Sequence, residues 1–442
     1  MIGWVLGLAL LGLVAALIRG RSGESDRIRA GFRARGYPTT AAELDAWYRP
    51  APAASNAAPL AVEAVGQLRP LAGRKSPYVD ARADPLRRGE PWPADQRESL
   101  AALVRTNAEA LGLLRAALER PESRYAVNLN QGFNAPLPNV EGVRLAARHL
   151  RAAAMAAVLA GDLDAAERRI EEQLKLAGTL APEPLVISQL VRMAILQIAV
   201  QTLQDALSQG RFPSDPLRRM AAAFAASVPR GAMERGLIGE MCLGGDFFRT
   251  PASQSGLVGG GAPSAVFLGA YGLLGLRAAD EVYFLVTMRD MIEASPLEGP
   301  VRLGRMDEIE ARLARDRARR WPVHLLSGML LPAFTKFADK AASAEAMVVA
   351  AQVACALEGY RVAQAGTLPE RLESLVPEWL PAVPADPFDG QPLRYLRQGA
   401  GYTVYSVGED RKDSGGRERP RGGKPGPPES TDLTFTVERR GP

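Results

Sequence analysis

The chain has 442 residues, of which 47% are hydrophobic and 23% charged, and this is the composition of a folded protein with a sizeable core. Its net charge of +5 comes from 54 basic and 49 acidic side chains spread along the whole chain, so we expect no clustered basic face and no nucleic-acid partner. Cys242 and Cys355, the two cysteines, are too few for a disulfide framework or a cysteine zinc site.

Residues 1–20 predict a membrane anchor. Ile2 to Ile18 form an uncharged apolar run at the lower length limit for a transmembrane helix, and Arg19 and Arg21 end it. A cleaved signal peptide is disfavoured, because no basic residues precede the run and no small-x-small cleavage site follows it. Taken alone, the positive-inside rule would place the remainder of the chain in the cytoplasm.

Residues 21–320 have the pattern of an α-helical domain. Thr39 or Thr40 can cap a helix after a break at Tyr37-Pro38, and a helical hairpin follows in which Gly161 ends one helix and Asp162 caps the next. Apolar periodicity predicts further helices over 94–119, 143–160, 163–180, 185–207, within 213–229, 277–295 and 306–320.

Two apolar segments of this domain have a membrane alternative. The helix from Leu185 to Leu207 is long enough to span a bilayer, but polar residues such as Gln189 and Arg192 recur along it and favour a buried core helix. The uncharged, glycine-rich segment from Gly256 to Leu276 leaves three interpretations open: a second membrane segment, a patch on the membrane surface, or a buried loop.

Residues 321–442 predict an α+β unit. An apolar helix from Trp321 to Lys336 should be interrupted by Pro332, and a long amphipathic helix should continue from Phe337 to Val362. A short helix near Leu372 and two hairpin strands, Leu393 to Arg397 and Tyr402 to Val407, complete a small antiparallel sheet.

Four landmarks in this unit occur in a characteristic order. They are the proline break in the apolar helix, ALEGY (Ala356 to Tyr360) running into Gly366 and Leu368-Pro369, ADPFDGQPLRY (Ala385 to Tyr395) and YSVGEDRKDSGG (Tyr405 to Gly416). In this order they resemble the pseudopilins of type II secretion systems, most closely the major pseudopilin. The resemblance covers about a quarter of the chain, from Met329 to Val437. The whole chain also resembles uncharacterised membrane-anchored proteins of planctomycete-type bacteria that carry this C-terminal unit.

The resemblance implies a calcium site in the final loop, with Asp410, Asp413 and Asp432 as its acidic ligands. The alternative is a turn capped by aspartate side chains without a metal, because the basic, proline- and glycine-rich insertion over 415–430 would repel a cation. The apolar helix is internal and lacks the processing site of the family, so we do not expect assembly into a filament.

The sequence offers no catalytic set. His149 and His324 are the only histidines, they lie far apart in the sequence, and no HExxH, CxxC or GxSxG pattern is present. We therefore expect a single-pass protein of the bacterial inner membrane, non-enzymatic, with structural or protein-binding roles in a secretion or pilus-like system. The resemblance implies a body outside the cytoplasm. The alternative is an enzyme with its active site in a cleft of the helical body near Asn128 to Asn139.

Overall fold

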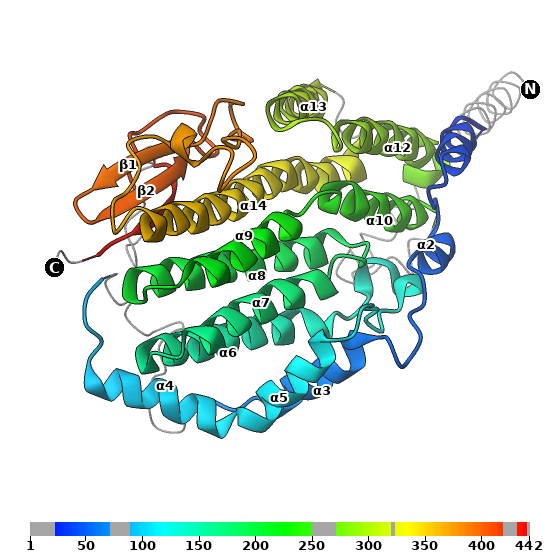
Figure 1. Cartoon of the computed structure of the whole chain (residues 1–442). Coiled ribbons are helices and arrows are strands. Elements are labelled where there is room, and N and C mark those ends of the chain that lie inside the picture. Colours follow the sequence, from blue (N-terminus) through cyan, green and yellow to red (C-terminus); the bar gives the residue numbers. More distant parts are fainter. Residues whose placement is uncertain (1–22, 71–88, 250–270, 320–322, 419–430, 440–442) are drawn as a thin grey trace, which may run out of the picture.

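The computed structural model describes residues 23–70, 89–249, 271–319, 323–418 and 431–439. The predicted membrane anchor, most of the segment from Gly256 to Leu276 and most of the insertion over 415–430 lie outside these residues. The described part is mainly α-helical and carries a small antiparallel sheet, which confirms the predicted fold class at this level. Its long helices stack side by side, with the sheet at one end and the N-terminal residues at the other (Figure 1).

The described helices follow the chain in this order: α2 (Ala41–Trp47), α3 (Ala57–Gln67), α4 (Ala94–Thr106), α5 (Ala108–Leu118), η1 (Leu129–Asn134), α6 (Pro138–Ala160), α7 (Leu163–Thr179), α8 (Val186–Gln209), α9 (Ser214–Ser227), α10 (Ala232–Phe247), α12 (Leu276–Ala294), α13 (Gly299–Arg319), α14 (Leu325–Ala363) and η3 (Leu372–Leu375). Residues 23–34 are also helical. The strands are β1 (Arg394–Gln398), β2 (Gly401–Ser406) and β3 (Leu433–Val437).

Local capping signals set several of these boundaries as predicted. The Thr40 hydroxyl accepts a hydrogen bond from the Glu43 backbone N–H at the start of α2. Gly161 adopts a left-handed conformation (φ 79°) after α6, and Asp162 caps α7. The helix predicted over 94–119 is instead divided into α4 and α5 at Asn107, because this side chain bonds to the backbone of Arg69 and to the carbonyl of Leu103.

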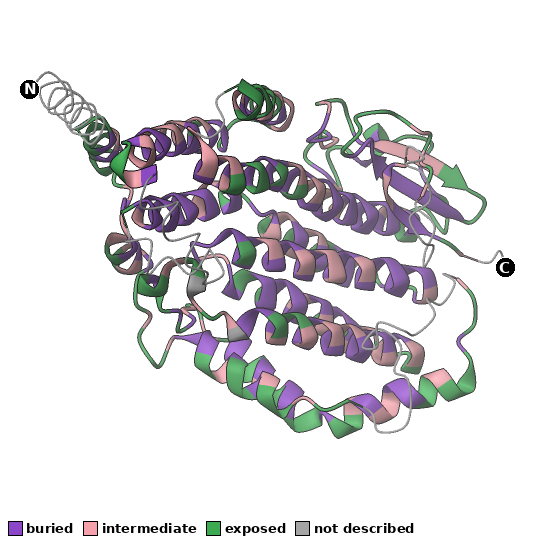
Figure 2. Ribbon diagram, turned by 180° about the vertical axis from the view of Figure 1, so that it is seen from behind, coloured by how far each residue is buried: buried purple, intermediate pink, exposed green. Residues whose placement is uncertain are grey.

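Helices α8 and α14 form the centre of the core. Both are long and apolar enough to cross a membrane, yet most of the apolar stretch of each is buried inside the protein. Helix α14 packs along α8, α9, α12 and α13. Figure 2 shows the buried surfaces of the central helices and the exposed outer faces of α4 and α5. Helix α8 is therefore the core helix that its polar residues predicted.

Pro332 does not interrupt α14, and this prediction was wrong. A proline inside a helix removes one backbone hydrogen bond and costs about 3 kcal/mol. Leu331 and Phe334 on either side of it are buried in the core, and full burial of such a side chain contributes about 1.5–3 kcal/mol. Packing on both sides of the proline thus offsets the local penalty, and the helix runs through.

Helix α10 was not predicted, because its sequence contains four glycines, which are poor helix formers. The glycines permit close packing. A Cβ atom at Gly239 would lie 1.6 Å from the carbonyl oxygen of Pro184, and one at Gly244 would lie 2.3 Å from the ring of Phe284. Glycine therefore lets α10 approach both α12 and the loop between α7 and α8.

The sheet has the order β1-β2-β3, with β2 in the centre and every β2 residue buried. A two-residue turn with Gly399 at φ 58° joins β1 to β2, as a type II′ hairpin requires. The free edge of β3 is covered by α8: the N–H of Thr436 donates to the Gln204 side chain, and that of Glu438 to Ser208. The sheet thus packs on α8 as well as on α14.

The beginning of the described chain is fixed to the helical body. Arg29 is buried and pairs with the buried carboxylate of Glu281 on α12 at 2.8 Å. Phe32, three residues later in the same helix, is fully buried. Arg249, at the end of α10, bonds to both Asp26 and Glu281. The helix that begins at residue 23 is thus held against α10 and α12.

Candidate functional site

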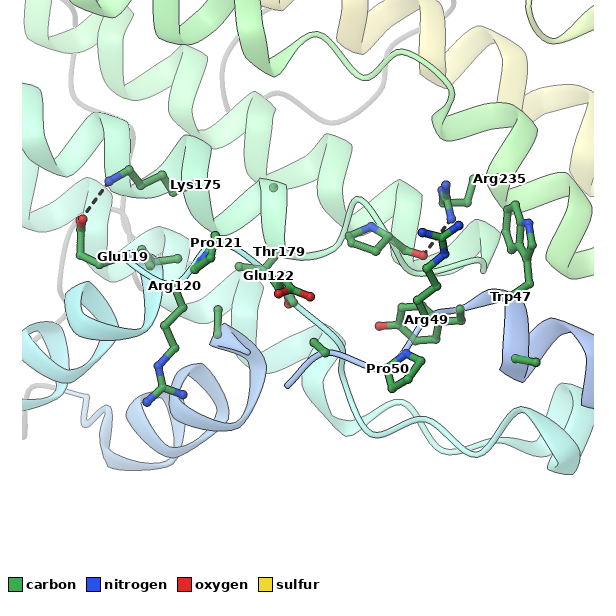
Figure 3. Close-up of a pocket in the computed structure, with 18 residues that line it drawn as sticks. Trp47, Arg49, Pro50, Glu119, Arg120, Pro121, Glu122, Lys175, Thr179 and Arg235 are labelled. Atoms are coloured by element: carbon green, nitrogen blue, oxygen red, sulfur yellow. Dashed lines mark hydrogen bonds and ion pairs between the residues drawn. The ribbon is translucent and has the colours of Figure 1, made fainter. Parts of the chain in front are cut away.

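A groove of about 1010 Å³ lies on the face formed by α2, α5, α7 and α10. A second cavity of about 460 Å³ adjoins it and shares Trp47, Pro182 and Arg235 with it. We call the two together the α2–α10 groove. Figure 3 shows its larger part, in which side chains from these separate elements face one space.

Tyr48 lines the groove, and its hydroxyl meets the backbone of Tyr125. Tyr48 is buried, and its hydroxyl accepts a hydrogen bond from the backbone N–H of Tyr125 at 3.0 Å. The Tyr125 hydroxyl is 2.9 Å from that of Thr179. Burial raises the pKa of both tyrosines, with the nearby carboxylate of Glu183 acting in the same direction. Both phenols therefore stay protonated at neutral pH.

Glu183 is a buried titratable group near Asn139, at the end of the loop where the enzyme cleft is predicted. It is fully buried, Ser188 donates a hydrogen bond to it at 2.8 Å, and burial raises its pKa. It does not line the groove, and neither does the loop from Asn128 to Asn139. The enzyme alternative thus has a buried, perturbed carboxyl group nearby, but the described groove brings no acid and base together around a reachable site.

Arginines gather at one end of the groove. Arg49 and Arg235 reach into the space beside Trp47 (Figure 3), and Arg192 and Arg230 line the adjoining cavity. The Arg235 guanidinium lies over the Trp47 ring, 4.5 Å from its centroid, and donates to the carbonyl of Pro182 at 3.3 Å. We call Arg49, Arg192, Arg230 and Arg235 the arginine cluster.

The opposite end of the groove has balanced charge. Lys175 on α7 pairs with Glu119 after α5 at 3.0 Å, and both side chains are well exposed. Glu122 accepts a hydrogen bond from Ser55, and Arg120 donates to the carbonyl of Asn56. The lining residues include no histidine or cysteine among those described. Their chemistry is that of binding through charge and aromatic contact.

The predicted calcium ligands lie in the loop after β2 and at the start of β3. The Asp432 carboxylate is buried and accepts hydrogen bonds from the backbone N–H groups of Ser414 and Gly416. Asp413 accepts from Gly415, and Asp410 from Lys412, each in a turn closed by the aspartate side chain. In the part of the chain that the structure describes, no group of three His, Cys, Asp or Glu side chains is arranged to hold a metal.

Asp386 of the ADPFDG segment has a structural role. It is fully buried and accepts hydrogen bonds from Ser406, from the Val407 N–H and from Arg394, at 2.8 to 2.9 Å. Arg394 also pairs with Asp389. The pKa of Asp389 lies below its ordinary value, because bonds from Arg394 and the backbone outweigh the opposing effect of burial. This segment therefore fastens the loop before β1 to the end of β2.

The histidines and cysteines singled out in the sequence are separate from the groove. His149 is buried on α6 and bonds to the carbonyl of Leu145, and burial lowers its pKa. His324 stacks on Tyr283 with ring centroids 3.9 Å apart. Cys242 and Cys355 are buried free thiols. None of the four lines the α2–α10 groove.

The sequence does not predict the groove residues as a site, because they come from distant parts of the chain. The sequence pattern makes Arg192 one polar residue of a core helix, and it does not predict the helix that carries Arg235. A signal was present in the dense aromatic and basic composition around Trp47 to Arg49. Comparisons with family models, curated proteins and solved structures found no match to the chain.

Proposed function

We propose that this chain is a membrane-anchored, non-enzymatic protein of the bacterial inner membrane that binds a protein partner through the α2–α10 groove. The observation that carries the proposal is the groove itself, which is wide, open and lined by cationic and aromatic side chains. Such residues are enriched in protein-binding surfaces. The predicted anchor at residues 1–20 joins the body where Arg29 fixes the first described helix.

Exposed apolar side chains support the membrane part of the proposal. Leu273 and Leu274 are 78% and 63% exposed, and Met329 on α14 is 64% exposed. The Tyr271 hydroxyl bonds to the backbone of Val323 and Leu325, so residues 271–275 lie against the beginning of α14. Helix α12, which follows residues 271–275, carries the partner of Arg29 and so lies beside the first described helix (Figure 1). An apolar end beside an anchor is suited to contact with lipid.

The helix-plus-sheet unit supports a place in a secretion or pilus-like system, with the body outside the cytoplasm. A long helix carrying a small antiparallel sheet is the arrangement that the pseudopilin resemblance implies, over Met329 to Val437. Because the sheet also packs on α8, we propose that this unit serves the packing of the body and partner binding, and does not polymerise.

Fractionation of cells tests the membrane proposal. The full chain should sediment with membranes, resist extraction by alkaline carbonate and dissolve in detergent, as an inserted helix requires. Protease added to spheroplasts should degrade the body if it lies outside the cytoplasm. Recovery of the intact chain in the soluble fraction would exclude both the anchor and the localisation.

Calcium is proposed as a ligand of the loop that contains Asp410, Asp413 and Asp432. Asp413 and Asp432 accept hydrogen bonds from adjacent backbone N–H groups, those of Gly415 and Ser414. A hard cation can take backbone carbonyls as its remaining ligands. Calcium at a hundredfold excess over Kd should stabilise the chain by about 2.7 kcal/mol in thermal or urea unfolding. Magnesium at the same concentration is the control. Unchanged stability with calcium would remove the assignment.

A further inference from the structure

Arg192 is a buried cation without a counter-ion. It lies on α8, only 9% of the residue is exposed, and its Nε atom is enclosed without a hydrogen-bond partner. Neither a hydrogen bond nor an ion pair joins Arg192 to any other residue that the structure describes. Buried arginines are normally paired, because removing a charge from water is costly. The guanidinium nevertheless lines the smaller cavity of the groove, where a ligand can reach it.

Further positive charge surrounds the same cavity. Arg230 and Arg235 line it with Arg192, and Arg49 lies in the adjoining groove. Burial and the neighbouring charge of Arg235 lower the pKa of Arg192 to about 10, which still leaves the guanidinium charged at neutral pH. Burial also lowers the pKa of Arg235. The cations thus repel one another in a partly desolvated space, an arrangement that an anion would relieve.

The N-terminus of α10 lies at the cavity, and the N–H of Ala232 there donates to the carbonyl of Pro229. Gly231 precedes the helix in a left-handed conformation (φ 70°), and no side chain caps this terminus. Gly231 and Ala232 both line the cavity. Helix N-termini carry unsatisfied N–H groups and a partial positive charge, which favour bound anions.

The protein's own carboxylate does not neutralise the cluster. Glu234 also lines the cavity, and it accepts a hydrogen bond from the Tyr37 hydroxyl at 2.5 Å. One glutamate among the described lining residues faces the three arginines of the smaller cavity. The net charge around this cavity is therefore positive.

We propose that Arg192, Arg230, Arg235 and the N-terminus of α10 form an oxyanion site that takes a carboxylate or a phosphate group. A planar guanidinium can donate two parallel hydrogen bonds to either group. The inference rests on the proposed function in that it names the chemistry a partner must present to the groove. Anion binding can be measured without a partner, so the two proposals can fail separately.

The test is titration of the full chain in detergent with inorganic phosphate and, separately, with succinate, followed by calorimetry. We expect saturable binding of at least one of them, with Kd of about 1 mM or tighter, competing with the other if both bind. Phosphate binding alone would indicate a phosphorylated ligand, and succinate binding alone a carboxylate ligand. Binding of neither anion at this affinity would overturn the inference.

Two variants locate the site. Arg192→Met keeps the length and apolar stem of the side chain and should weaken anion binding at least about tenfold, because the central donor is lost. Arg168→Met removes an exposed arginine on α7 and should leave binding unchanged. Equal binding by wild type and Arg192→Met would contradict the assignment.

The melting temperature distinguishes an arginine that binds a ligand from one that does not. Without anion, Arg192→Met should melt at the same or a higher temperature than wild type, since an unpaired buried charge has been removed. The anion should raise the melting temperature of wild type and of Arg168→Met only. A variant that melts far below wild type without anion would show that Arg192 serves stability and would overturn the inference.

Discussion

Replacing Arg439 with alanine should lower the free energy of unfolding by about 3–5 kcal/mol, because it leaves a buried carboxylate without its main partner. Arg439 follows β3 and is 7% exposed, and its guanidinium lies 2.7 Å from the buried carboxylate of Glu358 on α14. It also donates to the carbonyls of Leu207 and Gly210 at the end of α8. One side chain thus joins β3, α8 and α14.

Urea unfolding of the full chain in detergent measures this loss. Arg397→Ala, which removes an exposed arginine from β1, is the matched control and should change stability by less than about 0.5 kcal/mol. The double variant Arg439→Met, Glu358→Gln removes both charges and should recover much of the loss. If Arg439→Ala and Arg397→Ala are equally stable, the buried ion pair contributes nothing and the packing of the sheet on α8 must depend on other contacts.

Raising the pH from 4.5 to above 7 should destabilise the protein through Glu240. This carboxyl on α10 is buried, accepts a hydrogen bond from the Val186 N–H at 3.1 Å, and burial raises its pKa to about 7 from an ordinary value of 4.5. The folded state therefore holds the proton more tightly than the unfolded state. Stability from this group is complete below pH 4.5 and is lost as the pH rises through 7.

The comparison with Glu240→Gln isolates this effect. Each unit of pKa shift corresponds to about 1.4 kcal/mol, so the stability of the variant relative to wild type should rise by about 3 kcal/mol between pH 4.5 and pH 8. Glu109→Gln, at an exposed position on α5, should show no such trend. Unfolding measured across this pH range would contradict the account if the difference between Glu240→Gln and wild type stayed constant.

Local signals predicted much of the fold. The α6–α7 hairpin follows from Gly161 and Asp162, and the start of α2 from Thr40, since each cap acts on backbone groups within a few residues. The β1–β2 hairpin follows in the same way from its glycine turn. These elements need no knowledge of distant contacts.

Distant contacts decided the features that prediction missed. Pro332 stays inside α14 because its flanking residues are buried by other helices, and α10 exists because its glycines admit the Pro184 carbonyl and the Phe284 ring. The sequence around Arg192 is that of a core helix, and its unpaired charge becomes evident only when α10 brings Arg235 beside it. Burial and pairing depend on the assembled fold, which local periodicity does not encode.

Photo-crosslinking from the groove tests the central claim most directly. A benzophenone amino acid placed at Ala46, an exposed residue lining the groove, should cross-link a defined protein in intact membranes, while the same probe at Ala311 on the outer face of α13 should not capture it. Charge reversal at Arg235 should abolish the Ala46 product. The same products from Ala46 and Ala311, or a product from Ala46 that is insensitive to Arg235, would contradict a partner-binding role for the groove.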